Sequence, residues 1–382
     1  MEKLWIGLGI FFSLVMGILA FDKEEIQLES FQEKVKVEYD SKYKAPDVKA
    51  YKVHTLIPFW KSEVKVSSTG SVDTKTLGNY PIVYRAGSVK KTQTVIVQDS
   101  KKPKLEFVND PTYQKMVTAI DNYDGDITAD IQIELKGKNV LYSVTDSSGN
   151  KASLKRKVNI PNKKKKASKE SSKTIYLTFD DGPSEYTDHL LDILDQYNVS
   201  ATFFTTSAQP NKAECMKRAH EKGHTVAVHT QTHDYSDIYS SEKAYWADYD
   251  KQNEAIKEMT GQSSTIFRFP GGSSNTISQK YSNGIMTRLV KQAKKRKLQF
   301  FDWNVSSGDA GEVTTSEAVF YNVILGIQAA HNVDEPSVVL QHDTHAYSVD
   351  AVERIILWGL DNGYEFQALQ PDSFAPHHPI SN

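Results

Sequence analysis

Side chains able to do acid–base and metal chemistry follow several short apolar runs in the second half of the chain. The run "TIYLTF" is followed by Asp180 and Asp181, and then by Gly182 and Pro183, which are strong turn formers. A turn needs only one of the two carboxylates, and adjacent like charges repel each other. The pair therefore suggests a separate task for each aspartate.

A pair of histidines four residues apart, His229 and His233 in "HTQTH", is spaced to place both imidazoles on one side of a helical turn. In a chain with 11 histidines such a pair is weak evidence alone, since it arises by chance. A carboxylate completes a three-ligand metal site with open positions, and Asp181 is our candidate. Asp180 is then free to act as a general base, held ionised and aimed by Arg268 through a bidentate ion pair.

Hydrolysis of an amide or ester also needs an acid for the leaving group. His342, in the apolar run "SVVLQHD", is our candidate, and Asp302 is a carboxylate able to hold its tautomer and raise its pKa. Taken alone, the motif fits a metal ligand or a hydrogen-bonded core histidine as well. The acid is therefore assigned only in combination with the other motifs.

The elements that must position these residues alternate between strands and helices from residue 174 onward. Apolar runs predict strands at 175–180, 201–206, 225–229, 265–270, 299–304, 337–343 and 365–369, with helical patterns between most of them. This alternation predicts parallel βα units, and reactive groups at strand ends favour a barrel with its active site at that edge. We expect a distorted (β/α) barrel of about seven strands.

Five motifs in this region, taken in order, resemble those of the polysaccharide deacetylase family, also called carbohydrate esterase family four. They are "TFDDGP", "HTQTH", "RFPGG", "DWNVSSGD" and "LQH", and the resemblance covers residues 174–369. It implies an α/β fold and a metal-dependent deacetylase. The roles that it implies are base for Asp180, metal ligands for Asp181, His229 and His233, a partner of the base for Arg268, and an acid for His342 that Asp302 orients.

The same resemblance implies a substrate pocket. Gly271 would offer a backbone N–H to the oxyanion, and Trp303 and Leu340 would form the wall around the acetyl group. The family commonly has an aromatic residue where this chain has Gly271. We therefore expect the chemistry to persist in a sugar cleft that lacks one ring.

The first half of the chain has short alternating runs separated by turn residues, which predict two small all-β sandwich domains at 48–100 and 101–160. The segment "DNYDGDIT" followed by "YSVTDSSGNKAS" resembles the bacterial immunoglobulin-like repeats of surface proteins. The acidic "DNYDGD" invites a calcium assignment, but it lacks the spacing of a helix-loop-helix site, and a structural turn is favoured. Residues 23–47 are predicted to form a stalk, and the Lys-rich residues 161–173 a flexible linker to the deacetylase domain at 174–382.

The N-terminal residues 1–22 contain an uncharged run that is near the minimum length for crossing a bilayer, about 18 residues. We expect a membrane anchor on the extracellular face of a bacterial membrane or cell wall, with cleavage and secretion as the alternative. The single cysteine, Cys215, excludes an intrachain disulfide. The net charge of −2 argues against a nucleic-acid partner.

The function that these features predict is metal-dependent N-deacetylation of a surface glycan, with the N-acetylglucosamine of peptidoglycan as the leading substrate. Zinc is the default metal, and an Asp-His-His set also accepts cobalt, nickel or manganese. One alternative is an O-acetyl esterase acting on a polysaccharide, which needs the same groups. Another is a non-catalytic glycan-binding surface protein.

Overall fold

A computed structural model describes residues 22–56, 60–162, 164 and 170–382. The chain divides into two compact units. The first holds the described residues up to Lys104 together with Ala119–Asp130 and Val144–Ala152, and the second holds Leu105–Thr118, Ile131–Ser143 and Ser153–Asn382. The division does not follow the predicted boundary at residue 160, because strands before that point share the core of the second unit.

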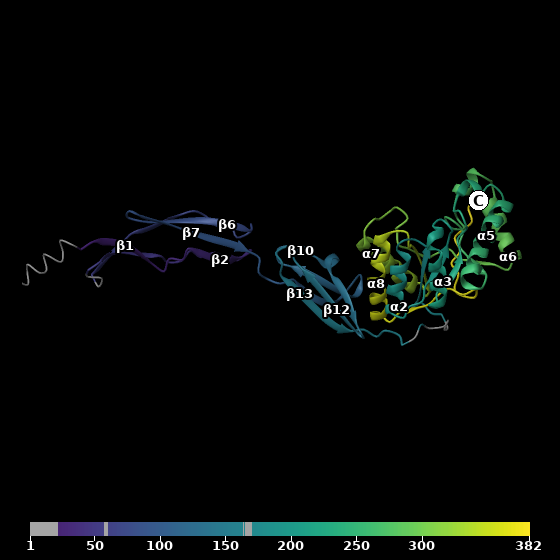
Figure 1. Ribbon diagram of the computed structural model, residues 1–382, viewed down its shortest axis with the longest axis horizontal. Coiled ribbons are helices and arrows are strands. Elements are labelled where there is room, and N and C mark those ends of the chain that lie inside the picture. Colours follow the sequence, from purple (N-terminus) through teal and green to yellow (C-terminus); the bar gives the residue numbers. More distant parts are fainter. Residues whose placement is uncertain (1–21, 57–59, 163, 165–169) are drawn as a thin grey trace, which may run out of the picture. The chain divides into compact units, whose positions relative to one another are not determined.

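The second unit is built on a curled sheet of parallel strands (Figure 1), in the order β18-β17-β16-β15-β14-β20-β19, with β21 paired to the start of β14. The strands are β14 (Thr174–Asp180), β15 (Thr202–Thr205), β16 (Thr225–Val228), β17 (Ile266–Phe267), β18 (Gln299–Phe300), β19 (Val305–Ser306), β20 (Ser337–His342) and β21 (Glu365–Phe366). Neighbouring strands run parallel. The predicted parallel βα architecture is confirmed, as a curled half-barrel whose edge strands β18 and β19 are not paired to each other.

Helices connect these strands: α2 (Thr187–Gln196), α3 (Glu214–Glu221), the short α4 (Tyr235–Ile238), α5 (Glu242–Thr260), α6 (Ile285–Lys295), α7 (Ser316–Asn332) and α8 (Ala346–Asp361). Side chains that cap free backbone N–H groups define three of the starts. Asp234 accepts from Ser236 N before α4. Ser241 accepts from Ala244 N before α5, and Thr315 accepts from Ala318 N before α7. The longer helices agree with the predicted patterns, whereas α4 was not predicted because a four-residue helix shows no periodicity.

The alternation of side chains along β14 decides which way the catalytic candidates point. Ile175, Leu177 and Phe179 lie in the large core that also contains the apolar faces of the helices. Tyr176 lies in a second cluster on the opposite face of the sheet, with residues of the neighbouring strands. Because side chains in a strand alternate between faces, Asp180 shares the face of Tyr176, on the concave side of the sheet.

The C-terminal segment runs along β18, at one edge of the curled sheet. Asp302 N donates to Pro376 O over 3.0 Å, and the His377 ring stacks on Phe300 with centroids 4.1 Å apart. At the end of the chain, Asn382 O accepts from Thr287 N of α6 over 2.8 Å. The segment is therefore part of the domain rather than a solvated tail.

Two small sheets precede this domain in the first unit. One has the order β1-β3-β4, with β1 (Glu24–Glu29), β3 (Lys49–His54) and β4 (Lys61–Val64); the other has the order β2-β7-β6-β5, with β2 (Lys34–Glu38), β7 (Val89–Gln98), β6 (Gly78–Ala86) and β5 (Val66–Thr69). The predicted stalk at 23–47 is therefore wrong. Its many charged residues make the alternation of buried and exposed side chains along a strand hard to recognise. In β1, Ile26 and Leu28 are half-buried between exposed neighbours.

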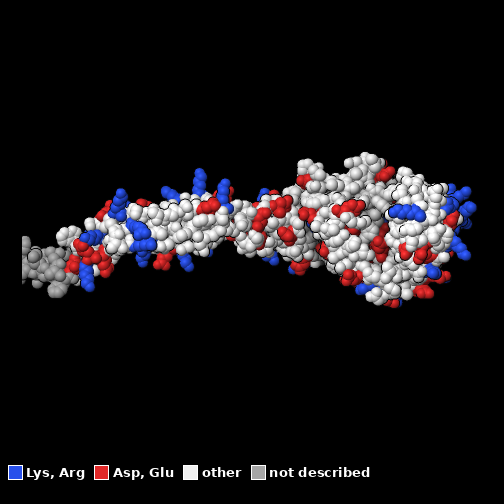
Figure 2. All heavy atoms as spheres, turned by 90° about the horizontal axis from the view of Figure 1, so that it is seen from above, with Lys and Arg blue, Asp and Glu red and all other residues white. Residues whose placement is uncertain are grey.

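Two further small sheets have the orders β10-β9-β8 and β11-β12-β13. Their strands are β8 (Lys104–Asp110), β9 (Gln114–Asp121), β10 (Gly125–Asp126), β11 (Gln132–Lys136), β12 (Asn139–Thr145) and β13 (Lys151–Lys157). Val140 and Tyr142 of β12 belong to the same core as α8, and Trp358 Nε1 of α8 donates to Tyr113 O over 2.6 Å. On the face in Figure 2, acidic and basic side chains are interspersed over the small sheets.

Two predicted segments fall largely or partly outside the described residues. The N-terminal anchor at 1–22 is one of them, and among the helices that the structure describes none is long and apolar enough to span a bilayer. The linker at 161–173 is described only in part. Within it, Lys164 Nζ donates to Asp195 Oδ1 over 2.7 Å.

Candidate active site

The carboxyl ends of neighbouring parallel strands bring the predicted chemical groups to one edge of the sheet. Asp180 ends β14 and Asp181 follows it, His229 follows β16, and His342 ends β20. His229 Nε2 lies 3.4 Å from Asp181 Oδ1, and His342 Nε2 lies 3.9 Å from Asp181 Oδ2. The carboxyl edge of a parallel sheet is where α/β proteins usually place their active sites.

The backbone at this edge is held in unusual conformations. Asp181 has φ 70° and His233 has φ 56°, in the left-handed region that residues with a Cβ rarely adopt. Gly182 sits against Asp343, so closely that a Cβ on it would lie 2.3 Å from the carboxylate oxygens. The turn after β14 therefore requires a glycine at position 182, because a side chain does not fit there. The strained backbone of Asp181 and His233 is typical of functional sites.

Asp181, His229 and His233 form a set of donors that fits a divalent metal ion. Nε2 of each histidine lies 3.4 Å from Asp181 Oδ1, and that oxygen is buried without a hydrogen-bond partner. Donor atoms about 2.0–2.1 Å from a tetrahedral ion are separated by about 3.3 Å, close to the spacing seen here. The residues present thus suit a three-ligand metal site.

The tautomer and charge of His229 also suit a ligand. Its Nδ1–H donates to Arg268 O over 3.0 Å, which leaves the lone pair of Nε2 facing Asp181. Complete burial lowers the pKa of His229 more than the nearby carboxylates raise it. A neutral imidazole is the form that binds metal.

Asp180 is buried and paired with Arg268, as the sequence predicted, but through one contact instead of two. Arg268 Nη1 donates to Asp180 Oδ1 over 2.7 Å. The remaining donors of the fully buried guanidinium reach Thr178 Oγ1 and the carbonyl oxygens of Phe301 and Asp302. The predicted bidentate pair is therefore wrong. The single contact leaves Asp180 Oδ2 open, 3.8 Å from His229 Nε2.

His342 has a different partner from the one that the sequence predicted. Its Nδ1 donates to Asp309 Oδ1 over 2.8 Å, and its backbone N donates to Asp309 Oδ2 over 2.8 Å. Burial disfavours the charged ring, but Asp309, with smaller contributions from Asp180 and Asp181, outweighs it and raises the pKa of His342 to about 9. The ring is thus protonated near neutral pH, with Nε2–H facing the metal candidates.

Asp302, which was predicted to orient His342, has another task. Its carboxylate accepts from Ser273 N over 2.8 Å, from the Ser273 hydroxyl, and from His378 N over 2.8 Å. It therefore fixes the loop after Gly271 and Gly272 and ties the C-terminal segment to it. Sequence reasoning chose Asp302 because it ends the fifth predicted strand. Asp309, seven residues later and beyond β19, carries no local signal of its contact with His342.

Tyr235 of α4 places an aromatic ring beside Gly271, at the position where the sequence led us to expect that a ring is missing. A Cβ on Gly271 would lie 2.6 Å from the hydroxyl oxygen of Tyr235, in α4 just after His233. Burial, and then the charge of Asp181, raise the pKa of Tyr235 to about 12, so the phenol stays a hydrogen-bond donor. Sequence reasoning missed Tyr235, whose only signal was its place directly after the histidine motif.

The two predicted wall residues lie on either side of this region. The Trp303 ring packs against Gly272, where a Cβ would come within 3.0 Å of it, and Leu340 is buried on β20 two residues before His342. Leu340 shares the face of His342 by the alternation of β20, whereas Trp303 lies in the loop between β18 and β19.

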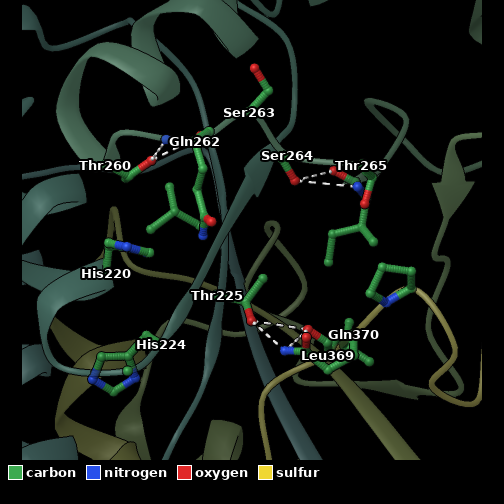
Figure 3. A pocket seen from close by; sticks show the side chains of 14 residues that line it. His220, His224, Thr225, Thr260, Gln262, Ser263, Ser264, Thr265, Leu369 and Gln370 are labelled. Atoms are coloured by element: carbon green, nitrogen blue, oxygen red, sulfur yellow. Dashed lines mark hydrogen bonds between the residues drawn. The ribbon is translucent and has the colours of Figure 1, made fainter.

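A cavity of about 350 Å³ lies at the opposite edge of the sheet, at the amino ends of β16 and β17 (Figure 3). Thr225 Oγ1 there donates to Leu369 O over 2.9 Å, and the other labelled residues are mostly Ser, Thr and Gln. Burial, and then the charge of Lys164, lower the pKa of His224 to about 3, so that this histidine is neutral. The cavity lacks the acid–base pairs found at the carboxyl edge.

The fold and these acid–base pairs place the chain among α/β proteins that carry the groups needed for hydrolysis. A family model described as "Polysaccharide deacetylase" matches residues 167–288. The chain is 31% identical over 215 residues to the peptidoglycan-N-acetylglucosamine deacetylase of Bacillus cereus, covering 55% of this chain and 72% of that protein. The chain therefore belongs to the polysaccharide deacetylase family, which confirms the resemblance of the five motifs.

Other relatives agree. The peptidoglycan-N-acetylglucosamine deacetylase PgdA of Listeria monocytogenes is 29% identical over 233 residues, which are 60% of this chain and 45% of that protein. The crystal structure of the catalytic domain of a peptidoglycan N-acetylglucosamine deacetylase from Eubacterium rectale matches 56% of this chain and 96% of that domain. That match has a TM-score of 0.54 and 49% identity.

Proposed function

We propose that the protein is a metal-dependent N-deacetylase that removes acetyl groups from the N-acetylglucosamine of peptidoglycan. The proposal rests on the different roles that neighbouring residues can take at the carboxyl edge of the sheet. Asp181, His229 and His233 meet as a donor set, while Asp180 and His342 remain free of it as a base and an acid. The printed names of the relatives support peptidoglycan as the glycan.

A divalent ion held by Asp181, His229 and His233, zinc by default, would polarise the acetamide carbonyl and acidify a water molecule. Asp180 is the base in this proposal: its Oδ2 is free to accept the proton of an attacking water molecule, while its Oδ1 is held by Arg268. The buried guanidinium of Arg268 aims the carboxylate through this charge-assisted hydrogen bond.

His342 completes the reaction by giving its Nε2 proton to the leaving amine. Asp309 holds the ring through Nδ1–H and stabilises the charged form, so that the proton is present before the C–N bond breaks. The Gly271 N–H faces the developing oxyanion in this proposal, and Trp303 and Leu340 exclude water from the acetyl methyl group.

The rest of the chain keeps this enzyme at its substrate. The small paired sheets before the deacetylase domain support two immunoglobulin-like sandwich domains, of which the first begins at β1 rather than at residue 48. The uncharged run within residues 1–22 supports an anchor in a bacterial membrane, with the enzyme outside the cell. In this arrangement the sandwiches are spacers that carry the site to the wall.

The test is release of free amine from purified peptidoglycan, with O-acetylated xylan as the competing substrate. We expect new amine on peptidoglycan, loss of activity with a chelator, and recovery with zinc. An Asp180→Asn variant should lose activity yet bind zinc, whereas a His229→Ala variant should lose zinc as well. Release of acetate from xylan alone would refute the N-deacetylase proposal, and full activity of Asp180→Asn would refute the base.

A further inference from the structure

Three buried aspartates meet in the first unit, far along the chain from the deacetylase motifs. Asp99 follows β7, Asp121 ends β9, and Asp146 follows β12. Their exposed fractions are 6%, 5% and 6%. One carboxylate oxygen from each lies within 4.8 Å of the other two.

The donors that reach these carboxylates are uncharged amides. Asp146 Oδ1 accepts from Asn150 N over 2.7 Å, and its Oδ2 accepts from Asn150 Nδ2 over 2.9 Å. Asp99 Oδ1 accepts from Asn122 Nδ2 over 3.2 Å. Amide donors orient the three groups but do not neutralise their charge.

One carboxylate oxygen of Asp121 has no hydrogen-bond partner. Its Oδ1 accepts from Tyr123 N over 2.7 Å and from Asp124 N over 3.0 Å, whereas its Oδ2 is buried without a hydrogen-bond partner. A buried carboxylate oxygen without a partner is costly and rare in folded proteins. The neighbouring acids add to this cost, because three buried carboxylates with oxygens within 4.8 Å of one another repel each other.

We propose that Asp99, Asp121 and Asp146 bind a calcium ion. The donor set consists of oxygen alone, which suits a hard cation and not the nitrogen- or sulfur-seeking transition metals. A cation among the three carboxylates balances their charge and gives the open Asp121 oxygen a ligand bond. The site is separate from the deacetylase site and does not depend on its function.

The sequence favoured a structural turn for "DNYDGD", and the turn is present, because Asp121 Oδ1 caps the backbone of Tyr123 and Asp124. The turn uses only one carboxylate oxygen and leaves the other for the ion. The helix-loop-helix spacing rule does not apply, since the three ligands come from separate segments rather than from one loop.

Such an ion would tie the segment after β7 to the loops of the next pair of small sheets. Asp99 lies between β7 and β8, Asp121 is the last residue of β9, and Asp146 lies in the loop after β12. Calcium would therefore limit bending of the chain at residues 99–103, and calcium outside the cell is plentiful enough for sites of millimolar affinity.

The experiment is calcium titration of the full chain by calorimetry, with the deacetylase site saturated with zinc. We expect one calcium ion per chain with a Kd of about 1 mM or below, and a higher Tm of the unit that contains the three aspartates. Asp121→Asn should weaken binding at least about tenfold, since it removes one ligand charge. Asp126→Asn, in the same loop but outside the cluster, should bind calcium like the native chain.

The outcomes separate this site from the catalytic one. His229→Ala should lose zinc and keep calcium binding. The proposal fails if the native chain shows neither calcium heat nor a Tm rise at about 10 mM calcium, above the range of extracellular sites. It also fails if Asp121→Asn and Asp146→Asn both bind as tightly as the native chain, or if magnesium at equal concentration gives the same response. The native-chain titration decides the matter even where a variant does not fold.

Discussion

The contact between His342 and Asp309 predicts how the activity depends on pH. His342 must be protonated to act as an acid, and its pKa is raised to about 9 mainly by the hydrogen bond and charge of Asp309. The acid form is therefore present below that pH and is lost as the pH rises through it. Asp309→Asn keeps the shape of the side chain but removes the charge, so activity should fall at a lower pH.

The size of the effect follows from the two pKa values. With a pKa of about 9, roughly nine tenths of His342 is protonated at about pH 8; with the ordinary value of about 6.5, only about 3% is. The variant should therefore lose about thirtyfold in rate at about pH 8 and much less at about pH 6. A bound divalent ion lowers the pKa of His342 in both proteins, so the difference between the profiles is the quantity to compare.

The assay is the pH profile of kcat/KM on a soluble chitooligosaccharide at fixed zinc. Asp302→Asn is the matched control, because that carboxylate holds Ser273 and His378 rather than His342. It should lower the rate at every pH without moving the alkaline limb. The reasoning would be refuted by an unmoved limb in Asp309→Asn, or by a limb that moves in Asp302→Asn instead.

Three further predictions concern the surroundings of the site. Gly182→Ala should lower the free energy of unfolding by about 1–3 kcal/mol, because the methyl group of the alanine collides with the Asp343 carboxylate. Thermal unfolding would measure this loss, and an unchanged Tm would contradict it. Tyr235→Ala should lower kcat/KM on oligosaccharides about tenfold, or about 1.4 kcal/mol, because the ring beside Gly271 is lost. Tyr235→Phe keeps that ring and should retain most of the activity; equal losses in the two variants would show that the ring is not used. Alkylating agents should leave the activity intact, because Cys215 is buried and its thiol is protonated at neutral pH. Burial, followed by the charge of Asp188, raises the pKa of this thiol to about 11. Loss of activity together with labelling of Cys215 would contradict this prediction.

The strand ends of the deacetylase domain were predictable from the sequence for a physical reason. Strands buried on both faces, such as β14 with all seven residues buried, appear as continuous apolar runs that stop where the chain meets the site. The groups that follow them, such as Asp180 and His342, are therefore visible as polar residues at the end of each run. Their convergence then follows from parallel pairing.

Contacts made across loops were not predictable in this way. Asp302 and Asp309 lie in one loop region, and only the fold decides which of them meets His342. Tyr235 fills the space beside Gly271 from a different strand end. Both depend on where loops turn, and short loops carry no periodic pattern that indicates their path.

The strands at residues 24–38 were missed for another reason. In β1 the pattern is a weak alternation of two half-buried apolar residues, Ile26 and Leu28, among charged ones. Edge and surface strands of this kind bury little apolar area, so composition alone resembles that of a polar linker.

The C-terminal segment acts on the site through its backbone. Asp302 accepts from the main-chain N–H of His378, and its own N–H donates to the main-chain oxygen of Pro376. Main-chain contacts do not depend on the identity of the side chain, so this part of the attachment tolerates substitution, whereas the stacking of His377 on Phe300 and the contact of His378 Nε2 with Trp303 O do not. Comparison by residue identity would overlook the main-chain part, and structure-guided alignment of the path of the segment is the better guide to it.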